Sequence, residues 1–390
     1  MENIGINADG LTRVGQSTCL FAGKQLGQRN TLKFNHVGTG SIVFANNEDT
    51  MTVGVGQYYI KQGKFVCPYF EGKVQSIELT SRNLHYQLGV IKQIGYFSSS
   101  ASAPYTANKD GYLIEVDGDT STFNLVAIFN GTETVRVQST NFNGDFDLTK
   151  FNNLDLAKFQ VFKIEFLWLG GAAFRLWGKI KNNWTLLHSE QWDGAEAGDT
   201  FGGSPIVLSP NQFIRYEIRS TTGTGSLTYV CSQVSTEGSI DESGEAIAVR
   251  NNVSVTTNTI GTIYPLKGIK KQTAFRDAKI QILDFSVGIT ASSDSGIILL
   301  LLNPTLSAPL TYANTGKFQE GTATTQTVTS TGRILKAIPI NSQSAAVNFG
   351  NNYLNSLGIN IDNSLDEIVL AYQPTSTNQS VNGTINLKEY

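Results

Sequence analysis

The chain has 390 residues, which is enough for two or three domains or for one large β-sandwich with additions. Its formal net charge is -3 and no long stretch concentrates Lys and Arg, which excludes a protein whose affinity comes from neutralising many nucleic-acid phosphates. The chain contains 38 Gly, 21 Phe and 14 Tyr, and only 16% of its residues are charged, so we expect short strands joined by polar turns and almost no long amphipathic helix.

The cysteines and the apolar segments limit the cellular setting. Cys19, Cys67 and Cys231 lie far apart and lack the spacing of a zinc site, so we expect no disulfide framework, although one disulfide stays open. No charged segment followed by an apolar one opens the chain, and Ile297–Leu302 is too short to cross a bilayer. We therefore expect synthesis in a cytoplasm, no signal peptide and no membrane insertion.

Residues 1–60 are predicted to form an N-terminal β-arm. Their apolar stretches, such as Thr18–Ala22 and Ser41–Ala45, are short and lie between polar and glycine-rich segments. Strands this short need a neighbour to complete a core. An ordered extension of the body and an arm that clasps another subunit fit this pattern equally well.

Residues 61–253 are predicted to form the main β-sandwich. Short apolar segments recur here between glycines, prolines and asparagines, which is typical of successive antiparallel strands. Asp117-Gly118 and Asn130-Gly131 are strong signals for tight hairpin turns. Because two packed antiparallel sheets require strands with this spacing and one apolar face each, we expect an all-β, jelly-roll-like sandwich.

The densest apolar stretch, Asp155–Gly178, is predicted to be the centre of this sandwich. It is interpreted as a strand, a turn at Gly170-Gly171 and a returning strand over Ala173–Gly178. Along the first strand, the alternation places Lys163 and Glu165 on one face. The opposite face is expected to be largely buried and carries Phe162, Ile164, Phe166 and Trp168.

A later segment, Gln212–Arg219, is also predicted to be a strand. Its side chains would alternate between two faces, with Tyr216 and Ile218 on one of them. The other face would carry Arg215, Glu217 and Arg219.

The second domain is predicted to begin near Ser254, where the sequence becomes rich in Asn and Thr. Residues 254–390 continue the strand pattern and are expected to form a smaller C-terminal β-domain. The last predicted strand, Ser380–Leu387, alternates apolar and polar residues, so we expect a docked C-terminus.

The candidate catalytic residues do not form the pattern of an enzyme. His36, His85 and His188 are scattered, and no serine lies in a GxSxG turn. A retaining glycosidase needs two carboxyl groups about 5 Å apart on one face. The acids that were weighed for such a pair are interpreted as surface salt bridges, so the protein is predicted not to be an enzyme: Glu165, Glu190, Asp193, Glu196 and Glu217.

No metal or cofactor site is predicted. Asp117 and Asp119 lack the further acids of a calcium loop, so a hairpin turn is the better interpretation. Among the tryptophans, Trp168 and Trp177 are expected in the core. Trp184 and Trp192 lie next to polar loops and are the candidate glycan contacts, because a flat ring matches the apolar face of a pyranose.

Several motifs, taken in order, resemble a family of virion structural proteins from tailed bacteriophages. The resemblance runs from about Lys64 to the end, and the chain departs from it at Gly170–Arg175, where GGAAFR replaces a GVGRVR-like turn. It implies a β-rich component of the head or the tail and carries no catalytic residue or cofactor. The motifs are Ile94–Ser99, Asp110–Gly118, Lys158–Trp177, Ile214–Ser239, Leu302–Thr305 and Ile385–Tyr390.

These patterns together predict a non-enzymatic structural component of a tailed-phage virion, located in the particle after synthesis in the host cytoplasm. Its expected partners are other copies of itself and other head or tail proteins, without nucleic acid. The alternative is a carbohydrate-binding adsorption protein that contacts a host-surface glycan through Trp184 and Trp192. A polysaccharide hydrolase is the third interpretation.

Overall fold

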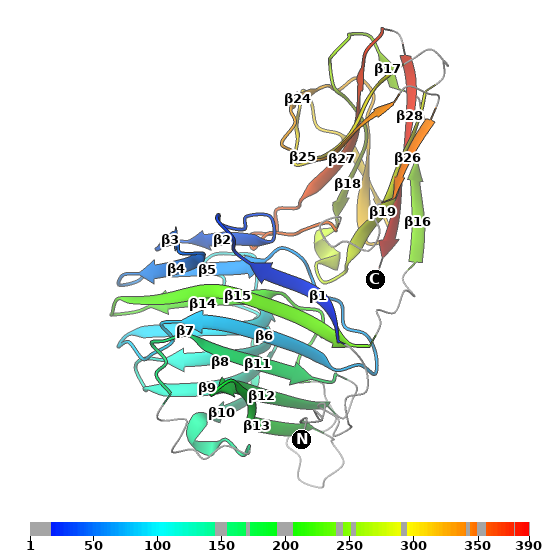
Figure 1. Ribbon diagram of the computed structural model, residues 1–390. Coiled ribbons are helices and arrows are strands. Elements are labelled where there is room, and N and C mark those ends of the chain that lie inside the picture. Colours follow the sequence, from blue (N-terminus) through cyan, green and yellow to red (C-terminus); the bar gives the residue numbers. More distant parts are fainter. Residues whose placement is uncertain are drawn as a thin grey trace. The chain divides into compact units, whose positions relative to one another are not determined.

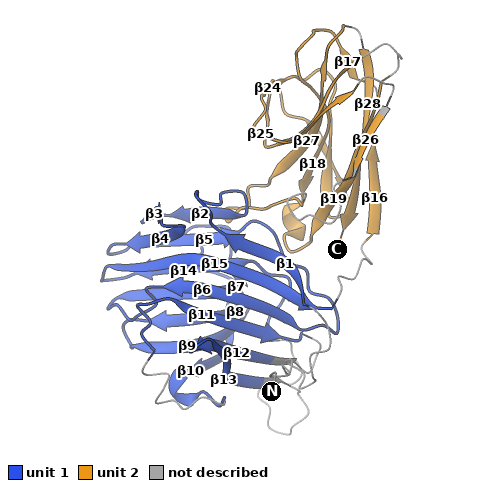
Figure 2. Cartoon of the chain, viewed as in Figure 1, with its two compact units in different colours: residues 1–241 blue, residues 242–390 orange. Residues whose placement is uncertain are grey.

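The computed structural model describes residues 17–144, 154–168, 172–192, 206–238, 245–250, 255–289, 295–340, 344–348, 356–377 and 379–389 (Figure 1). Within these residues, the regular structure is antiparallel β-sheet apart from two short 3-10 helices, η1 (Ser139–Asn141) and η2 (Thr273–Phe275). None of the helices described is long and apolar enough to cross a membrane. The chain forms two compact units, residues 1–241 and 242–390 (Figure 2). The predicted all-β sandwich is confirmed.

Unit 1 is built from an eight-stranded and a seven-stranded sheet. The first has the order β13 (Asn183–Trp192), β12 (Ala172–Ile180), β11 (Gln160–Phe166), β6 (Gln75–Arg82), β15 (Gly225–Glu237), β4 (Glu48–Val53) and β3 (Ser41–Ala45), and β1 (Ser17–Lys24) also pairs with β15. The second has the order β10 (Thr132–Gln138), β9 (Thr122–Phe129), β8 (Asp110–Asp117), β7 (Val90–Ser98), β14 (Ile214–Ser220), β5 (Tyr58–Gly63) and β2 (Phe34–Gly38).

The core of unit 1 contains apolar side chains from both sheets, and strand β11 contributes as predicted. Phe162, Ile164 and Phe166 are all buried there, and the Phe166 ring lies 4.7 Å from that of Tyr112 on the other sheet. Trp168 differs from the expectation. It follows the end of β11, is half-buried at the edge of the core, and donates its indole N–H to the Val207 carbonyl at 3.3 Å.

Strands β11 and β12 pair antiparallel, as the predicted central hairpin requires, and Phe166 lies opposite Phe174. The proposed turn at Gly170-Gly171 lies outside the described residues. The Asn130-Gly131 turn is confirmed, since both residues have positive φ (43° and 90°) between β9 and β10. The Asp117-Gly118 signal also marks a hairpin, although β9 begins only at Thr122.

The predicted N-terminal arm over residues 1–60 is not a separate element where the structure describes it. Strand β1 pairs with β15 of the eight-stranded sheet, and β2 pairs with β5 of the seven-stranded sheet. Phe21, Phe34 and Met51 lie in the core of unit 1. The short apolar stretches therefore find their neighbours in this unit, because strands far apart in sequence lie beside them.

Unit 2 contains a five-stranded and a six-stranded sheet around its own core, with a two-stranded sheet formed by β21 (Thr305–Leu306) and β24 (Val328–Ser330). The five-stranded sheet contains β16 (Glu245–Arg250), β28 (Gln379–Glu389), β19 (Ile280–Ile289), β26 (Ser344–Asn348) and β17 (Val255–Thr257), which pairs with β28. The six-stranded sheet has the order β22 (Thr311–Thr315), β23 (Phe318–Thr322), β18 (Tyr264–Lys271), β27 (Glu367–Pro374), β20 (Gly296–Leu302) and β25 (Arg333–Ile340).

The last strand of the chain, β28, is docked as predicted. It pairs with β16, β17 and β19, and Val381, Ile385 and Leu387 are buried. Because Ile247 of β16 lies opposite Leu387, the C-terminal unit includes strand residues before the expected boundary at Ser254.

Candidate ligand-binding site

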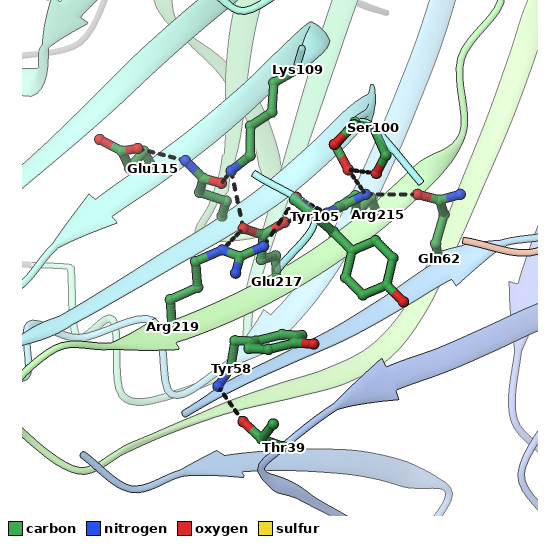
Figure 3. Close-up of polar contacts among 12 residues, drawn as sticks. Thr39, Tyr58, Gln62, Ser100, Tyr105, Lys109, Glu115, Arg215, Glu217 and Arg219 are labelled. Atoms are coloured by element: carbon green, nitrogen blue, oxygen red, sulfur yellow. Dashed lines mark hydrogen bonds and ion pairs between the residues drawn. The ribbon is translucent and has the colours of Figure 1, made fainter. Parts of the chain in front are cut away.

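Strand β14 places three charged side chains on the face of the seven-stranded sheet that is opposite the sandwich core, here called the outer face. Tyr216 and Ile218 lie in the core, as the alternation predicts. Arg215, Glu217 and Arg219 therefore lie on the outer face (Figure 3).

The carboxylate of Glu217 accepts hydrogen bonds from three cations (Figure 3). Arg215 donates to Oε2 from Nε at 2.9 Å and from Nη2 at 2.7 Å. Lys109 Nζ donates to Oε1 at 3.0 Å, and Arg219 Nε donates to the same oxygen. The side chains of Arg215 and Glu217 are 0% and 1% exposed, whereas that of Arg219 is 16% exposed, so the centre is closed and one guanidinium reaches solvent.

The electrostatics of this cluster follow from burial and from its excess of cations. Burial alone raises the pKa of Glu217, but the charges of Arg215, Lys109 and Arg219 outweigh it and hold this pKa well below its usual range. Burial lowers the pKa of Lys109, and the charge of Glu217 opposes that shift. One carboxylate thus faces three cations at short range.

A polar network continues from the cluster across the outer face. Lys109 Nζ donates to Gln93 Oε1, and Gln93 Nε2 donates to Glu115 Oε2 at 2.6 Å. Arg136 binds the other oxygen of Glu115 at 2.7 Å and also pairs with the exposed Glu133. The network therefore runs from β14 over β7 to β8 and then across β9 to β10.

The loop between β7 and β8 lies over this cluster. Arg215 Nη1 donates to Ser99 Oγ at 2.8 Å, which fixes the start of the loop. The carbonyl oxygen of Tyr105 accepts from Nη2 of both Arg215 and Arg219, at 3.0 and 3.1 Å. Tyr105 has a left-handed backbone (φ 61°), and this conformation directs its carbonyl to the two guanidinium groups.

Two aromatic rings and a guanidinium, those of Tyr58, Tyr105 and Arg219, form the edge of the cluster and are called the rim here. The Arg219 Cζ atom lies 5.1 Å from the Tyr58 ring centre, a cation–π distance. The Tyr58 and Tyr105 rings meet edge to face at 6.2 Å. Tyr58 is half-buried and its backbone N–H donates to the hydroxyl of exposed Thr39 (Figure 3). Tyr58 and Arg219 are therefore partly exposed, whereas Tyr105 is buried.

Gln62 leaves a buried donor without a partner next to this cluster. Its Oε1 accepts from Arg215 Nη1 at 3.0 Å. Its Nε2 is buried and makes no hydrogen bond with any residue in the described part of the chain. A buried amide N–H without an acceptor costs about 1–3 kcal/mol. Gln62 is 0% exposed, so this donor is closed from solvent.

The structure places the predicted glycan contacts elsewhere. Trp184 is half-buried on β13, on the eight-stranded sheet, and Lys163 Nζ lies 4.9 Å from its ring and 4.8 Å from that of Trp177. Trp177 is half-buried opposite Lys163 and does not belong to the core, which corrects the expectation. Side chains alternate along β12, so Phe174 and Leu176 face the core and Trp177 lies on the other face of the sheet. The side chain of Trp192 lies outside the described residues.

Two of the acids that were interpreted as surface salt bridges are buried. Glu165 is 0% exposed and pairs with Lys163 at 2.8 Å, and Glu217 lies in the cluster. Alternation located both on the faces opposite the core, but it carries no information about what covers those faces. Glu190 lies 3.0 Å from the ring of His188, and Asp193 and Glu196 lie outside the described residues.

The other candidate sites do not assemble in the structure. Asp117 Oδ1 accepts from the N–H of Asp119 at 2.8 Å, and Asp119 Oδ1 accepts from the N–H of Gly89 at 2.8 Å, as turn-forming side chains do. His36 lies on β2, where burial lowers its pKa to about 3. Throughout the described ranges, no group of three or more His, Cys, Asp and Glu side chains could hold a metal ion.

No protein family and no curated protein matches the chain. Among solved structures, the carbohydrate recognition domain of Emp47p is similar over 57% of this chain and 98% of its own length, with 10% identity and a TM-score of 0.37. A legume lectin-like domain from Entamoeba histolytica covers 53% of this chain and 91% of itself, with 11% identity and a TM-score of 0.32. A pseudo β-1,3-glucanase of Mycobacterium tuberculosis is similar over 57% of this chain and 99% of its own length, with 10% identity and a TM-score of 0.39. At such identities and TM-scores, these likenesses carry no argument about the ligand or activity of this chain.

The rim residues were not identified from sequence. The alternation in Arg215-Tyr216-Glu217-Ile218-Arg219 was a usable signal, because two arginines and a glutamate share one face of an otherwise apolar strand. Tyr58 and Tyr105 are distant in sequence and carry no such signal. Only the pairing of β5 with β14, and the loop after β7, brings them to Arg219.

Proposed function

We propose that this protein is a carbohydrate-binding component of a tailed-phage particle that contacts a host-surface glycan through the rim on unit 1. The observation that supports it is the half-buried Tyr58 ring beside the guanidinium of Arg219 and the ring of Tyr105. Aromatic rings stack on the apolar face of a sugar, and a few fixed polar groups bind its hydroxyls. The location in a virion is supported by the motif resemblance alone.

We also propose that binding is not followed by bond cleavage. A general acid must hold a proton near neutral pH. Although burial alone raises the pKa of Glu217, its cationic neighbours hold it well below the usual range. Both oxygens of this carboxylate already accept hydrogen bonds from cations. Incubation of the protein with any glycan that it binds should therefore release no reducing sugar.

Glycan-array binding of the full chain tests the main proposal. The wild-type protein should bind a defined subset of glycans, and Tyr58→Ala should lose that binding while the melting temperature stays close to the wild-type value. Tyr86→Ala is the matched control, because Tyr86 is an exposed tyrosine (38% exposed) in the segment between β6 and β7. Equal binding by both variants, or no binding by the wild type, contradicts the proposal.

A purely structural role in the particle is the second candidate, and the resemblance of the motifs in Lys158–Trp177 and Ile214–Ser239 favours it. A structural component should be present in many copies at symmetric positions and should be needed for assembly. Electron microscopy of intact particles, made with wild-type protein and with Tyr58→Ala, separates the two. Particles that assemble normally with the variant but fail to adsorb favour the glycan-binding role.

A further inference from the structure

The cluster around Glu217 contains more positive charge than its own carboxylates balance. Arg215, Arg219 and Lys109 share the single carboxylate of Glu217. The next carboxylates, Glu115 and Glu133, share the single Arg136, so the four cations of the network face three carboxylates and one positive charge is in excess. Unbalanced charge is costly where water is excluded, so an anion bound beside the arginines would stabilise this arrangement.

Two guanidinium groups converge on a neutral acceptor in this structure. Nη2 of Arg215 and Nη2 of Arg219 both donate to the backbone carbonyl of Tyr105. Charged donors form stronger hydrogen bonds with a carboxylate than with a neutral carbonyl, and a guanidinium can bind a carboxylate with two parallel bonds.

Arg219 has the free donor capacity that such binding needs. Its Nε is bound to Glu217 and its Nη2 to Tyr105, but its Nη1 makes no hydrogen bond with the residues that the structure describes. The side chain is also partly exposed. Arg215, by contrast, uses all three nitrogens within the protein, so we assign it a positioning role.

The Tyr58 ring beside Arg219 is a second indication of a ligand. Tyr58 lies opposite Arg219 on the neighbouring strand β5 and is half-buried. The site thus combines a guanidinium that has a free nitrogen with an aromatic ring, and both side chains are partly exposed.

We propose that the glycan bound at the rim is acidic, with the carboxylate of a uronic-acid sugar bound by Arg219. This inference rests on the proposed glycan-binding function and specifies its ligand. Tyr58 would stack on a sugar ring, and Arg215 would hold Glu217 and the loop in place.

Titration calorimetry of the full chain with oligogalacturonate, and with the same oligomer reduced at its carboxyl groups to a neutral form, tests the inference. The acidic oligomer should bind about tenfold or more tightly than the neutral one, and the difference should shrink at high salt. Equal binding of the two forms overturns the acidic assignment and leaves the proposed function standing. Binding of neither form to this chain, together with an empty glycan array, overturns both.

Variants locate the charge that binds the ligand. Arg219→Gln should remove the preference for the acidic oligomer, whereas Arg136→Gln should keep it, because Arg136 is an exposed arginine on the same sheet that pairs with Glu115 and Glu133. A preference for the acidic oligomer that persists in Arg219→Gln contradicts the proposed site. If Arg219→Gln does not fold, Tyr58→Ala decides: it should lose binding of the acidic oligomer, and unchanged binding contradicts the proposed site.

Discussion

Arg215 and Glu217 lie two residues apart on the outer face of β14 and form a two-point contact, in which Nε and Nη2 of the arginine donate to one carboxylate oxygen at 2.9 and 2.7 Å. The pair is closed from solvent, and Arg215 also binds Gln62, Ser99 and the carbonyl of Tyr105. A single buried guanidinium therefore connects β5, β14 and the loop that covers the sheet. The geometry of the rim depends on this contact.

Glu217→Gln should lower the free energy of unfolding by about 3–5 kcal/mol, because removing one partner of a buried ion pair leaves uncompensated charge. Here three cations would lose their shared carboxylate. Denaturant unfolding of the full chain measures this change. Glu133→Gln is the control, since Glu133 is 46% exposed and its loss should cost at most about 1 kcal/mol. If the two variants lose a similar free energy of unfolding, the cluster does not need the carboxylate of Glu217 for its stability.

Stability should depend on pH through Lys92, a lysine on the core side of β7. Its Nζ donates to the carbonyls of Asn83 and His85, and burial lowers its pKa to about 7. In the unfolded chain the pKa returns to about 10.4, so between these values the unfolded state binds a proton that the folded state lacks. The free energy of unfolding should therefore rise as the pH increases from about 7 to about 10.

Lys92→Met tests this dependence, because methionine keeps an unbranched apolar side chain without the amine. Chemical denaturation over that pH window measures the free energy of unfolding at each pH. Its rise with pH should be less steep for the variant than for the wild type. Some slope should remain, since burial also lowers the pKa of Lys61, to about 8. Lys158→Met, at a position that is 79% exposed, should leave the slope unchanged. If the two variants have equal slopes, the titration of Lys92 is not the cause.

Phe34→Ala should lower the free energy of unfolding of unit 1 by about 3–5 kcal/mol, since it removes a fully buried ring. That ring lies 5.6 Å from the ring of Phe21 and 5.0 Å from that of Tyr229, and Lys61 Nζ lies 4.4 Å from its centre. Thermal and denaturant melts compare it with Leu26→Ala, where the side chain is 67% exposed and little change is expected. If the Phe34→Ala protein is soluble and its stability is unchanged, the segment that contains Phe34 is not part of the core of unit 1 and is better described as a separate arm.

The sequence by itself determined the elements that depend on local pattern. Alternation correctly divided the faces of β11 and β14, so Phe162 was expected on a buried face, and Tyr216 was expected on the opposite face from Arg215 and Glu217. The Asn130-Gly131 turn was predictable because positive φ at both positions suits these two residues and few others. The docked last strand followed from its period of two.

The tertiary structure decided everything that depends on which strands are neighbours. Residues 17–60 resembled an arm because their strands are short, and only the pairing of β1 with β15 and β2 with β5 shows that they complete the sheets of unit 1. Burial of Glu217 also lies beyond local pattern, since the loop carrying Ser99 and Tyr105 covers a face that alternation marks only as polar. The rim joins Tyr58, Tyr105 and Arg219 from three separate segments, because hydrogen-bonded pairing of β5 with β14, rather than proximity along the chain, brings their side chains together.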